Sequence, residues 1–220
     1  CSGTETYETT GLNTNDTTAL GVLTITGLTG VDKIYDDTTA GSATGTASLS
    51  GVAAGANDVF LGGSPVFTFA SANVGTGIPI DASGYTLSGT DAGKYTLTQP
   101  TLSGDITAKE LTILGLTGQD KVYDGTTTAI ATGTAILSGL EPGDDVSLGG
   151  LPVFTFASAN VGTGISINAS GYTISGTDSE NYSLTQPTLS ADITTLNVTF
   201  TALSDLNILD GVQTGLGGGS

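Results

Sequence analysis

A tandem repeat constrains the fold of this chain more than any other feature. Residues 65–107 and 152–194 are identical at 35 of 43 positions. The match extends upstream, where LTITGLTGVDKIYDDTT from Leu23 aligns with LTILGLTGQDKVYDGTT from Leu111. A repeat of roughly 85 residues has the size of a small β-sandwich and is too long for one coil of a solenoid. We therefore expect two modules of the same fold in tandem.

The repeat divides the chain into four parts. Residues 1–21 are assigned to an N-terminal extension, residues 22–108 to the first module and residues 109–195 to the second. Residues 194–203 align with residues 107–116. We therefore expect residues 196–220 to hold a strand and a glycine-rich tail, at the start of an incomplete third module.

Apolar residues alternate with threonine and serine through both modules. Examples are Leu23 with Ile25 and Phe67 with Phe69, and the second copy repeats them. A period of two indicates strands with one buried face, and the Gly, Asn, Asp and Pro between the runs indicate turns. The sequence predicts an all-β chain with about seven short strands per module and essentially no helix.

One segment before a predicted strand resembles a known structural motif. It reads Asp91-Ala-Gly-Lys-Tyr95 in the first copy and Asp178-Ser-Glu-Asn-Tyr182 in the second. The pattern is similar to the tyrosine corner of immunoglobulin-like sandwiches, in which the tyrosine hydroxyl bonds to upstream backbone. The resemblance implies tandem Ig-like β-sandwich modules, with Asp91, Tyr95, Asp178 and Tyr182 in structural roles.

A second resemblance is to a family of repeats. Its residues are Lys33-Ile-Tyr-Asp-Asp37 and Lys121-Val-Tyr-Asp-Gly125, each followed by Thr-Thr, with the later GTDAGKYTLTQP and GTDSENYSLTQP stretches. Together they resemble the YDG-type repeat over residues 22–195. The resemblance implies a tandem module of large secreted bacterial proteins, including filamentous-haemagglutinin-like adhesins, and hence an extracellular or cell-surface location.

The first copy departs from this motif, because Asp37 stands where the second copy has Gly125. The departure predicts either a turn that tolerates aspartate or a locally different turn.

Charge and composition argue against several classes of function. The chain has 21 acidic and 4 basic residues, so its net charge is −17. Such a charge argues against binding to nucleic-acid phosphates and against docking on an anionic membrane surface. It has no histidine and one cysteine, which removes His-dependent catalysis and His/Cys zinc sites. We expect no enzyme and no catalytic residues.

Calcium is the one cofactor that the sequence suggests. Acidic loops contain Asp36 and Asp37 in the first module and Asp144 and Asp145 in the second. Calcium takes about six to eight oxygen ligands, which junctions between β modules can gather. The alternative is that these carboxylates form turns and are solvated.

Both ends of the chain carry candidate attachment residues. Cys1-Ser-Gly-Thr resembles the start of a mature lipoprotein, so a lipid on Cys1 would anchor the chain to a membrane. An intermolecular link and an arbitrary start of the chain are the alternatives. Val198 and Phe200 lie on one face of an alternating segment, which could add a strand to a like subunit and so build a homopolymer. The alternatives are that the segment extends an edge of the second module or that it is the cut end of a longer array.

These observations favour a structural function. We expect a non-enzymatic stalk or fibre segment of a bacterial surface adhesin or extracellular filament, whose partners are neighbouring modules or like subunits. The alternative is an adhesive module that binds a glycan or a protein. Its binding surface would be sought where the copies differ most, at residues 52–61 and 140–148.

Overall fold

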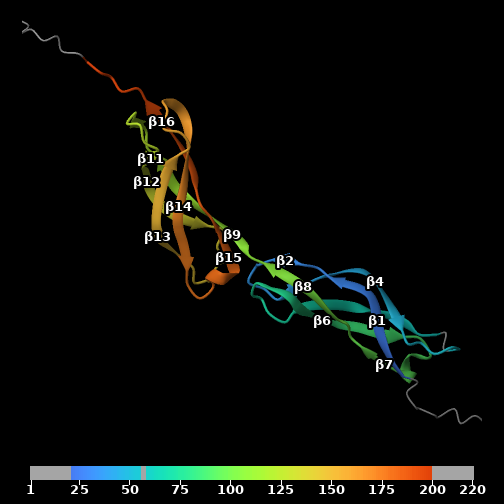
Figure 1. Cartoon of the computed structure of the whole chain (residues 1–220). Coiled ribbons are helices and arrows are strands. Elements are labelled where there is room, and N and C mark those ends of the chain that lie inside the picture. The colour runs from blue at the N-terminus through green and yellow to red at the C-terminus, as the bar shows by residue number, and fades with distance from the viewer. Residues whose placement is uncertain (1–20, 56–57, 200–220) are drawn as a thin grey trace, which may run out of the picture.

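The computed structural model describes residues 21–55 and 58–199. It contains two β modules that lie end to end (Figure 1). Strands β1 to β8 belong to module 1, and strands β9 to β16 belong to module 2. No helix within the described ranges has the length and apolar character needed to cross a membrane.

Module 1 contains eight strands and one short 3-10 turn. In chain order they are β1 (Gly21–Gly30), β2 (Lys33–Ile34), β3 (Ala40–Gly41), β4 (Ala43–Ser50), β5 (Phe60–Phe69), β6 (Gly75–Ser88), η1 (Ala92–Lys94), β7 (Tyr95–Thr98) and β8 (Thr101–Thr107).

Module 2 repeats this order element by element. Its elements are β9 (Lys109–Gly118), β10 (Lys121–Val122), β11 (Thr128–Ala129), β12 (Ala131–Ser138), β13 (Ser147–Phe156), β14 (Gly162–Ser175), η2 (Ser179–Asn181), β15 (Tyr182–Thr185) and β16 (Thr188–Thr194).

Each module has a three-stranded and a five-stranded sheet. In module 1 the strand orders are β4-β1-β7 and β2-β8-β6-β5-β3, and module 2 has the equivalent orders. The pairs β1–β7 and β2–β8 are parallel, and the other pairs are antiparallel. Because β1 and β2 belong to different sheets, as do β3 and β4, the chain crosses between the sheets after only one or two residues.

The core of each module is made by the alternating apolar residues that the sequence pattern indicated. Leu23, Phe69, Ile80 and Ile106 are almost fully buried in module 1. Their counterparts in module 2 are Leu111, Phe156, Ile167 and Ile193, and they are buried to the same degree. The near-identity of the two sequences therefore extends to their packing.

Paired glycines allow the strands to curl. In the β9–β12 ladder the register shifts between Gly133 and Ile136. A Cβ on Gly115, where φ is +84°, would lie 2.3 Å from the carbonyl oxygen of Thr134. A Cβ on Gly133 would lie 2.1 Å from the carbonyl oxygen of Gly115. Since no side chain fits at this approach, glycine on both strands permits the bulge that bends the sheet.

The prediction of an all-β chain is confirmed for the described residues, whose only helical elements are two three-residue 3-10 turns. The described residues form eight strands in each module, whereas about seven were predicted. The excess comes from two-residue pairings such as Lys33–Ile34, which the sequence did not predict. One 14-residue strand, β6, contains both Ile80 and Tyr85. Ser83 and Gly84 lie at a bulge within it.

The bulge predicts a sharp difference between two glycines of module 2. Gly115 and Gly125 have similar φ values, +84° and +78°, but no atom lies within 4 Å of the Cβ position at Gly125. Gly115→Ala should lower the free energy of unfolding by about 2 to 4 kcal/mol, because strain and a backbone clash add. Gly125→Ala should cost about 1 kcal/mol, from strain alone. Urea denaturation followed by circular dichroism measures both, and equal losses would contradict this account of the bulge.

Candidate functional site: the junction between the modules

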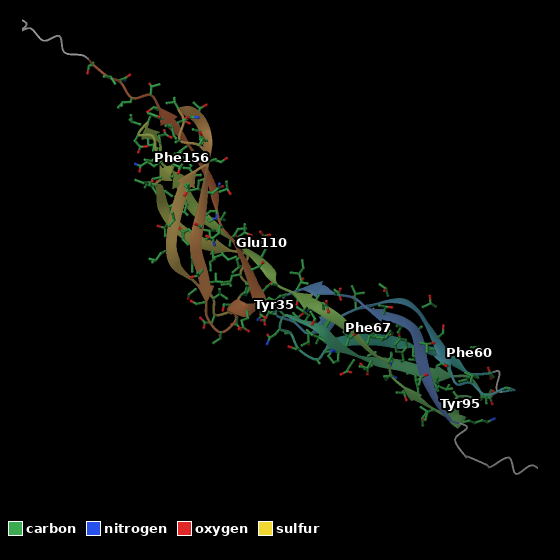
Figure 2. All side chains as sticks on the ribbon, viewed as in Figure 1. Tyr35, Phe60, Phe67, Tyr95, Glu110 and Phe156 are labelled. Atoms are coloured by element: carbon green, nitrogen blue, oxygen red, sulfur yellow. The ribbon has the colours of Figure 1, made fainter. Side chains whose placement is uncertain are left out.

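A single residue, Ala108, joins the modules, because β8 ends at Thr107 and β9 begins at Lys109. The chain thus passes directly from the five-stranded sheet of module 1 into the three-stranded sheet of module 2. Figure 2 shows Tyr35 at this point, where the two modules meet. Such a short link leaves the ends of the modules in contact.

The Lys-x-Tyr-Asp motif of module 1, residues 33–36, folds around Lys33. Lys33 Nζ donates to Asp36 Oδ1 at 2.5 Å and to the carbonyl oxygens of Thr38 and Ala40 at 2.7 and 3.2 Å. It also lies 5.7 Å from the ring centroid of Phe69, which is a cation–π distance. The ammonium group therefore ties the motif to the core, and this fixes the backbone that carries Tyr35.

Lys121 in module 2 makes the same contacts. Its Nζ donates to Asp124 Oδ1 at 2.8 Å and to the carbonyl oxygens of Thr126 and Thr128 at 2.7 and 3.1 Å. The hydrogen bond from Lys121 and those from Thr126 lower the pKa of Asp124 to about 2. The motif is thus a self-contained loop that forms in both modules.

Asp37 occupies the left-handed region with φ of 58°, at the position where Gly125 has φ of 78°. The turn therefore keeps its geometry and tolerates aspartate, which was one of the two alternatives from the sequence. Aspartate visits this region at a small energetic cost. Its Oδ1 atom lies 3.4 Å from the hydroxyl of Tyr35, so the substitution adds a polar group beside the junction.

Tyr35 connects the cores of the two modules. Only 2% of its surface is exposed, and its ring meets that of Tyr182 edge to face, with centroids 5.3 Å apart. The same apolar cluster contains Phe69 and Ile106 of module 1 and Leu111 of module 2. The core is therefore continuous across the junction.

One carboxylate accepts hydrogen bonds from both tyrosines. The hydroxyl of Tyr35 donates to Asp144 Oδ2 at 2.9 Å, and that of Tyr182 donates to the same oxygen at 2.6 Å. The Tyr182 hydroxyl also accepts from the backbone N–H of Glu141 at 2.9 Å. Hydrogen bonds to a charged acceptor are roughly twice as strong as neutral ones, so Asp144 holds the two rings together.

The environment of these hydroxyls opposes their ionisation. Burial and the Asp144 carboxylate raise the pKa of Tyr182 to about 12. Burial, with the hydrogen bond to Asp144, raises the pKa of Tyr35 as well. Both tyrosines therefore stay protonated, as donors to Asp144, well above the pH at which free tyrosine ionises.

Asn181 makes the second polar contact across the junction. Its Oδ1 accepts from the backbone N–H of Val74 at 3.0 Å, and its Nδ2 donates to Asn73 Oδ1 at 3.4 Å. It is 5% exposed and is the one buried polar residue among the described residues. The equivalent residue in module 1 is Lys94, which pairs with Asp91 near the surface.

The hydroxyls of Tyr95 and Tyr182 both bond to upstream backbone, but at a greater sequence separation than in a tyrosine corner. The hydroxyl of Tyr95 accepts from the backbone N–H of Ala53 at 3.1 Å, as Tyr182 does from Glu141. These partners lie in the loop after the fourth strand, about forty residues upstream. Asp91 and Asp178 precede the 3-10 turns and accept from the backbone N–H groups of Asp58 and Asp145.

The four aspartates of the calcium prediction do not form one cluster. Asp36 binds Lys33, and Asp145 accepts from the backbone N–H of Thr177. Asp37 and Asp144 both lie beside the Tyr35 hydroxyl, on opposite sides of the junction. No group of three acidic, His or Cys side chains suited to a metal occurs in the described ranges.

Of the predicted attachment residues, only Val198 is among the residues that the structure describes. Val198 is exposed and lies outside any strand. Phe200 and Cys1 lie outside the described residues.

Sequence reasoning missed the roles of Tyr35 and Asn181. Tyr35 belongs to the motif used to recognise the repeat, but nothing in the sequence marks its side chain as a contact between modules. Asn181 did leave a signal, because it is one of the few positions in the aligned segment where the copies differ. Differences between near-identical repeats can thus mark contacts that only one copy makes.

The shared carboxylate predicts an alkaline transition. Because the pKa of Tyr182 is raised to about 12, the folded protein keeps a proton that the unfolded chain releases near pH 10. The stabilisation is fully present below pH 10 and is lost as the pH rises towards 12. Titration of tyrosinate absorbance should show a late component from Tyr35 and Tyr182. Asp144→Asn should shift it to lower pH, and a single early step in the native protein would refute the prediction.

The two copies of the motif tyrosine provide a matched pair of variants. Tyr35→Ala should lower the free energy of unfolding by about 3 to 5 kcal/mol, because it removes a buried aromatic ring. Tyr123→Ala, at the equivalent but 40% exposed position, should cost less than about 1 kcal/mol. Calorimetry measures both changes. A similar loss in the two variants would show that Tyr35 acts within its own module rather than at the junction.

Comparison with models of protein families identifies the YDG domain in this chain. The model of the YDG domain matches residues 5–102 and again residues 107–191. No curated protein and no solved structure matches the chain. The two matched ranges cover most of the chain and contain both Lys-x-Tyr-Asp motifs, so the chain belongs to the YDG domain family.

Proposed function

We propose that this protein is a structural stalk or fibre segment of a bacterial surface adhesin or extracellular filament. The observation that carries the proposal is the junction, where the core of one module continues into the next through Tyr35 and Tyr182. A flexible string of modules would not require a shared core. A stalk does, because it must hold its modules in line.

Charge and repetition support the same role. A net charge of −17 on 220 residues keeps neighbouring chains apart in solution. Nearly identical modules add length without adding a new activity. We propose an extracellular or cell-surface location on the same grounds, together with the resemblance to repeats of secreted adhesins.

We further propose that each module is an Ig-like β-sandwich. Support comes from its two sheets and from the buried tyrosine at the start of β7 and of β15, whose hydroxyl accepts from upstream backbone. In each module the first strand also pairs in parallel with the strand that begins at this tyrosine, β1 with β7 and β9 with β15.

The proposal includes no enzymatic activity and leaves calcium as the candidate ligand. Asp37 and Asp144 are the pair best placed to share an ion, because both lie beside the Tyr35 hydroxyl at the junction. An ion there would compete with the tyrosine for Asp144. Calcium binding at this pair should therefore change the thermal unfolding temperature, and an unchanged temperature would argue against an ion there.

The adhesive alternative has one candidate location that spans the junction. A polar groove of about 250 Å³ is lined by Asn73 and Val74 of module 1 and by residues 177, 178, 180 and 181 of module 2. Its lining is suited to hydrogen bonding with a small polar ligand. A glycan is the ligand class that this chemistry would fit.

Small-angle X-ray scattering, paired with a glycan array, distinguishes these functions. A stalk should scatter as one elongated particle with the dimensions of two modules end to end, with and without calcium, and should bind no glycan. Tyr35→Ala should change the scattering profile, whereas Tyr123→Ala should leave it unchanged. A glycan that binds the native chain and is lost with Asn73→Ala would favour the adhesive function instead.

A further inference from the structure

The end of module 2 remote from module 1 repeats the surface that module 1 uses at the junction. This distal pole consists of Val122, Tyr123, Asn160 and Val161, the counterparts of Ile34, Tyr35, Asn73 and Val74. Tyr123 is 40% exposed, whereas Tyr35 is 2% exposed. The difference in exposure between the two tyrosines arises because module 2 covers Tyr35 at the junction.

The distal pole already has the backbone geometry of the covered surface. The N–H of Tyr123 donates to the carbonyl of Thr194 at 2.9 Å, as that of Tyr35 does to Thr107. The N–H of Asn160 donates to Ser158 Oγ at 3.1 Å, as that of Asn73 does to Ser71 at 3.0 Å. The surface is therefore formed before any partner binds, which lowers the cost of docking.

The sequence that follows β16 resembles the start of module 2. β16 ends at Thr194, as β8 ends at Thr107, and residues 194–203 align in sequence with residues 107–116. A module joined after Thr195 would begin where module 2 begins after module 1. The short link would then bring its first loops against Tyr123.

We infer that the distal pole of module 2 docks a further YDG module joined after Thr195, provided that this module has aspartate and asparagine at the positions of Asp144 and Asn181. The inference rests on the proposed stalk function and names its partner. Such a module would place its own counterparts of Asp144, Asn181 and Tyr182 against Tyr123, Asn160 and Val161.

The same chemistry argues against docking by module 1 of a second copy. Module 1 has Lys94 at the position of Asn181 and Asn57 at that of Asp144. Lysine has no acceptor for the N–H of Val161, and its charge would be buried where Asn181 is 5% exposed. An asparagine in place of Asp144 cannot make charge-assisted bonds to two tyrosines. The two residues therefore select which module fits the pole.

Hydroxyl-radical footprinting of a three-module chain tests the inference. A second copy of residues 109–195 is inserted after Thr195 in the full chain, and this copy carries Tyr123→Phe so that one Tyr123 remains. Labelling of Tyr123 should fall from its level in the native chain to that of Tyr35. The matched control is the same chain whose inserted copy also carries Asn181→Lys and Asp144→Asn. Its Tyr123 should label as in the native chain.

Two results would overturn the inference. Unchanged labelling of Tyr123 in the three-module chain, with circular dichroism showing that the inserted copy is folded, means that the pole does not dock. Equal protection in the test and control chains means that docking does not depend on the two selected residues. In either case the scattering profile of the native two-module chain still decides the stalk function by itself.

Discussion

The architecture of this chain depends on one carboxylate placed between two tyrosines. Asp144 of module 2 accepts hydrogen bonds from Tyr182 of its own module and from Tyr35 of its neighbour. The two rings pack edge to face and close the apolar cores against each other. Asp144 is partly buried, and its negative charge is best stabilised when both hydroxyls donate to it. The junction therefore combines apolar contact with directed hydrogen bonds, and these bonds set the relative orientation of the two modules.

The rest of the fold positions Tyr35, Asp144 and Tyr182 at the ends of the modules that meet. The lysine of each Lys-x-Tyr-Asp motif lies over the ring of a core phenylalanine and donates hydrogen bonds to the loop that follows, so the motif is fixed to the core. Glycine pairs such as Gly115 and Gly133 curl the sheets without side-chain clashes. The motif that identifies the family is thus a loop whose lysine and aspartate are structural and whose tyrosine is available for contact.

The sequence predicted the all-β class well because the period-two alternation of apolar residues is visible in one dimension. It did not predict β2 or β10, since two-residue pairings such as Lys33–Ile34 leave no periodic signal. It took Tyr182 for a residue of its own module only, because contact with Tyr35 requires knowing that the ends meet. The calcium aspartates were grouped by their acidity, but Asp36 is bound by a lysine from its own loop. Local patterns thus gave the strands, and contacts between modules needed three-dimensional placement.

The central claim is that the junction is a single, fixed arrangement. Pulsed electron spin resonance tests it directly, with labels on Thr86→Cys in module 1 and Thr173→Cys in module 2 of a chain that carries Cys1→Ser. Both threonines are exposed and lie on equivalent strands. The account predicts one narrow distribution of distances between the labels, which broadens with Tyr35→Ala and stays narrow with Tyr123→Ala. A broad distribution in the parent chain would contradict it, because the modules would then move independently about Ala108.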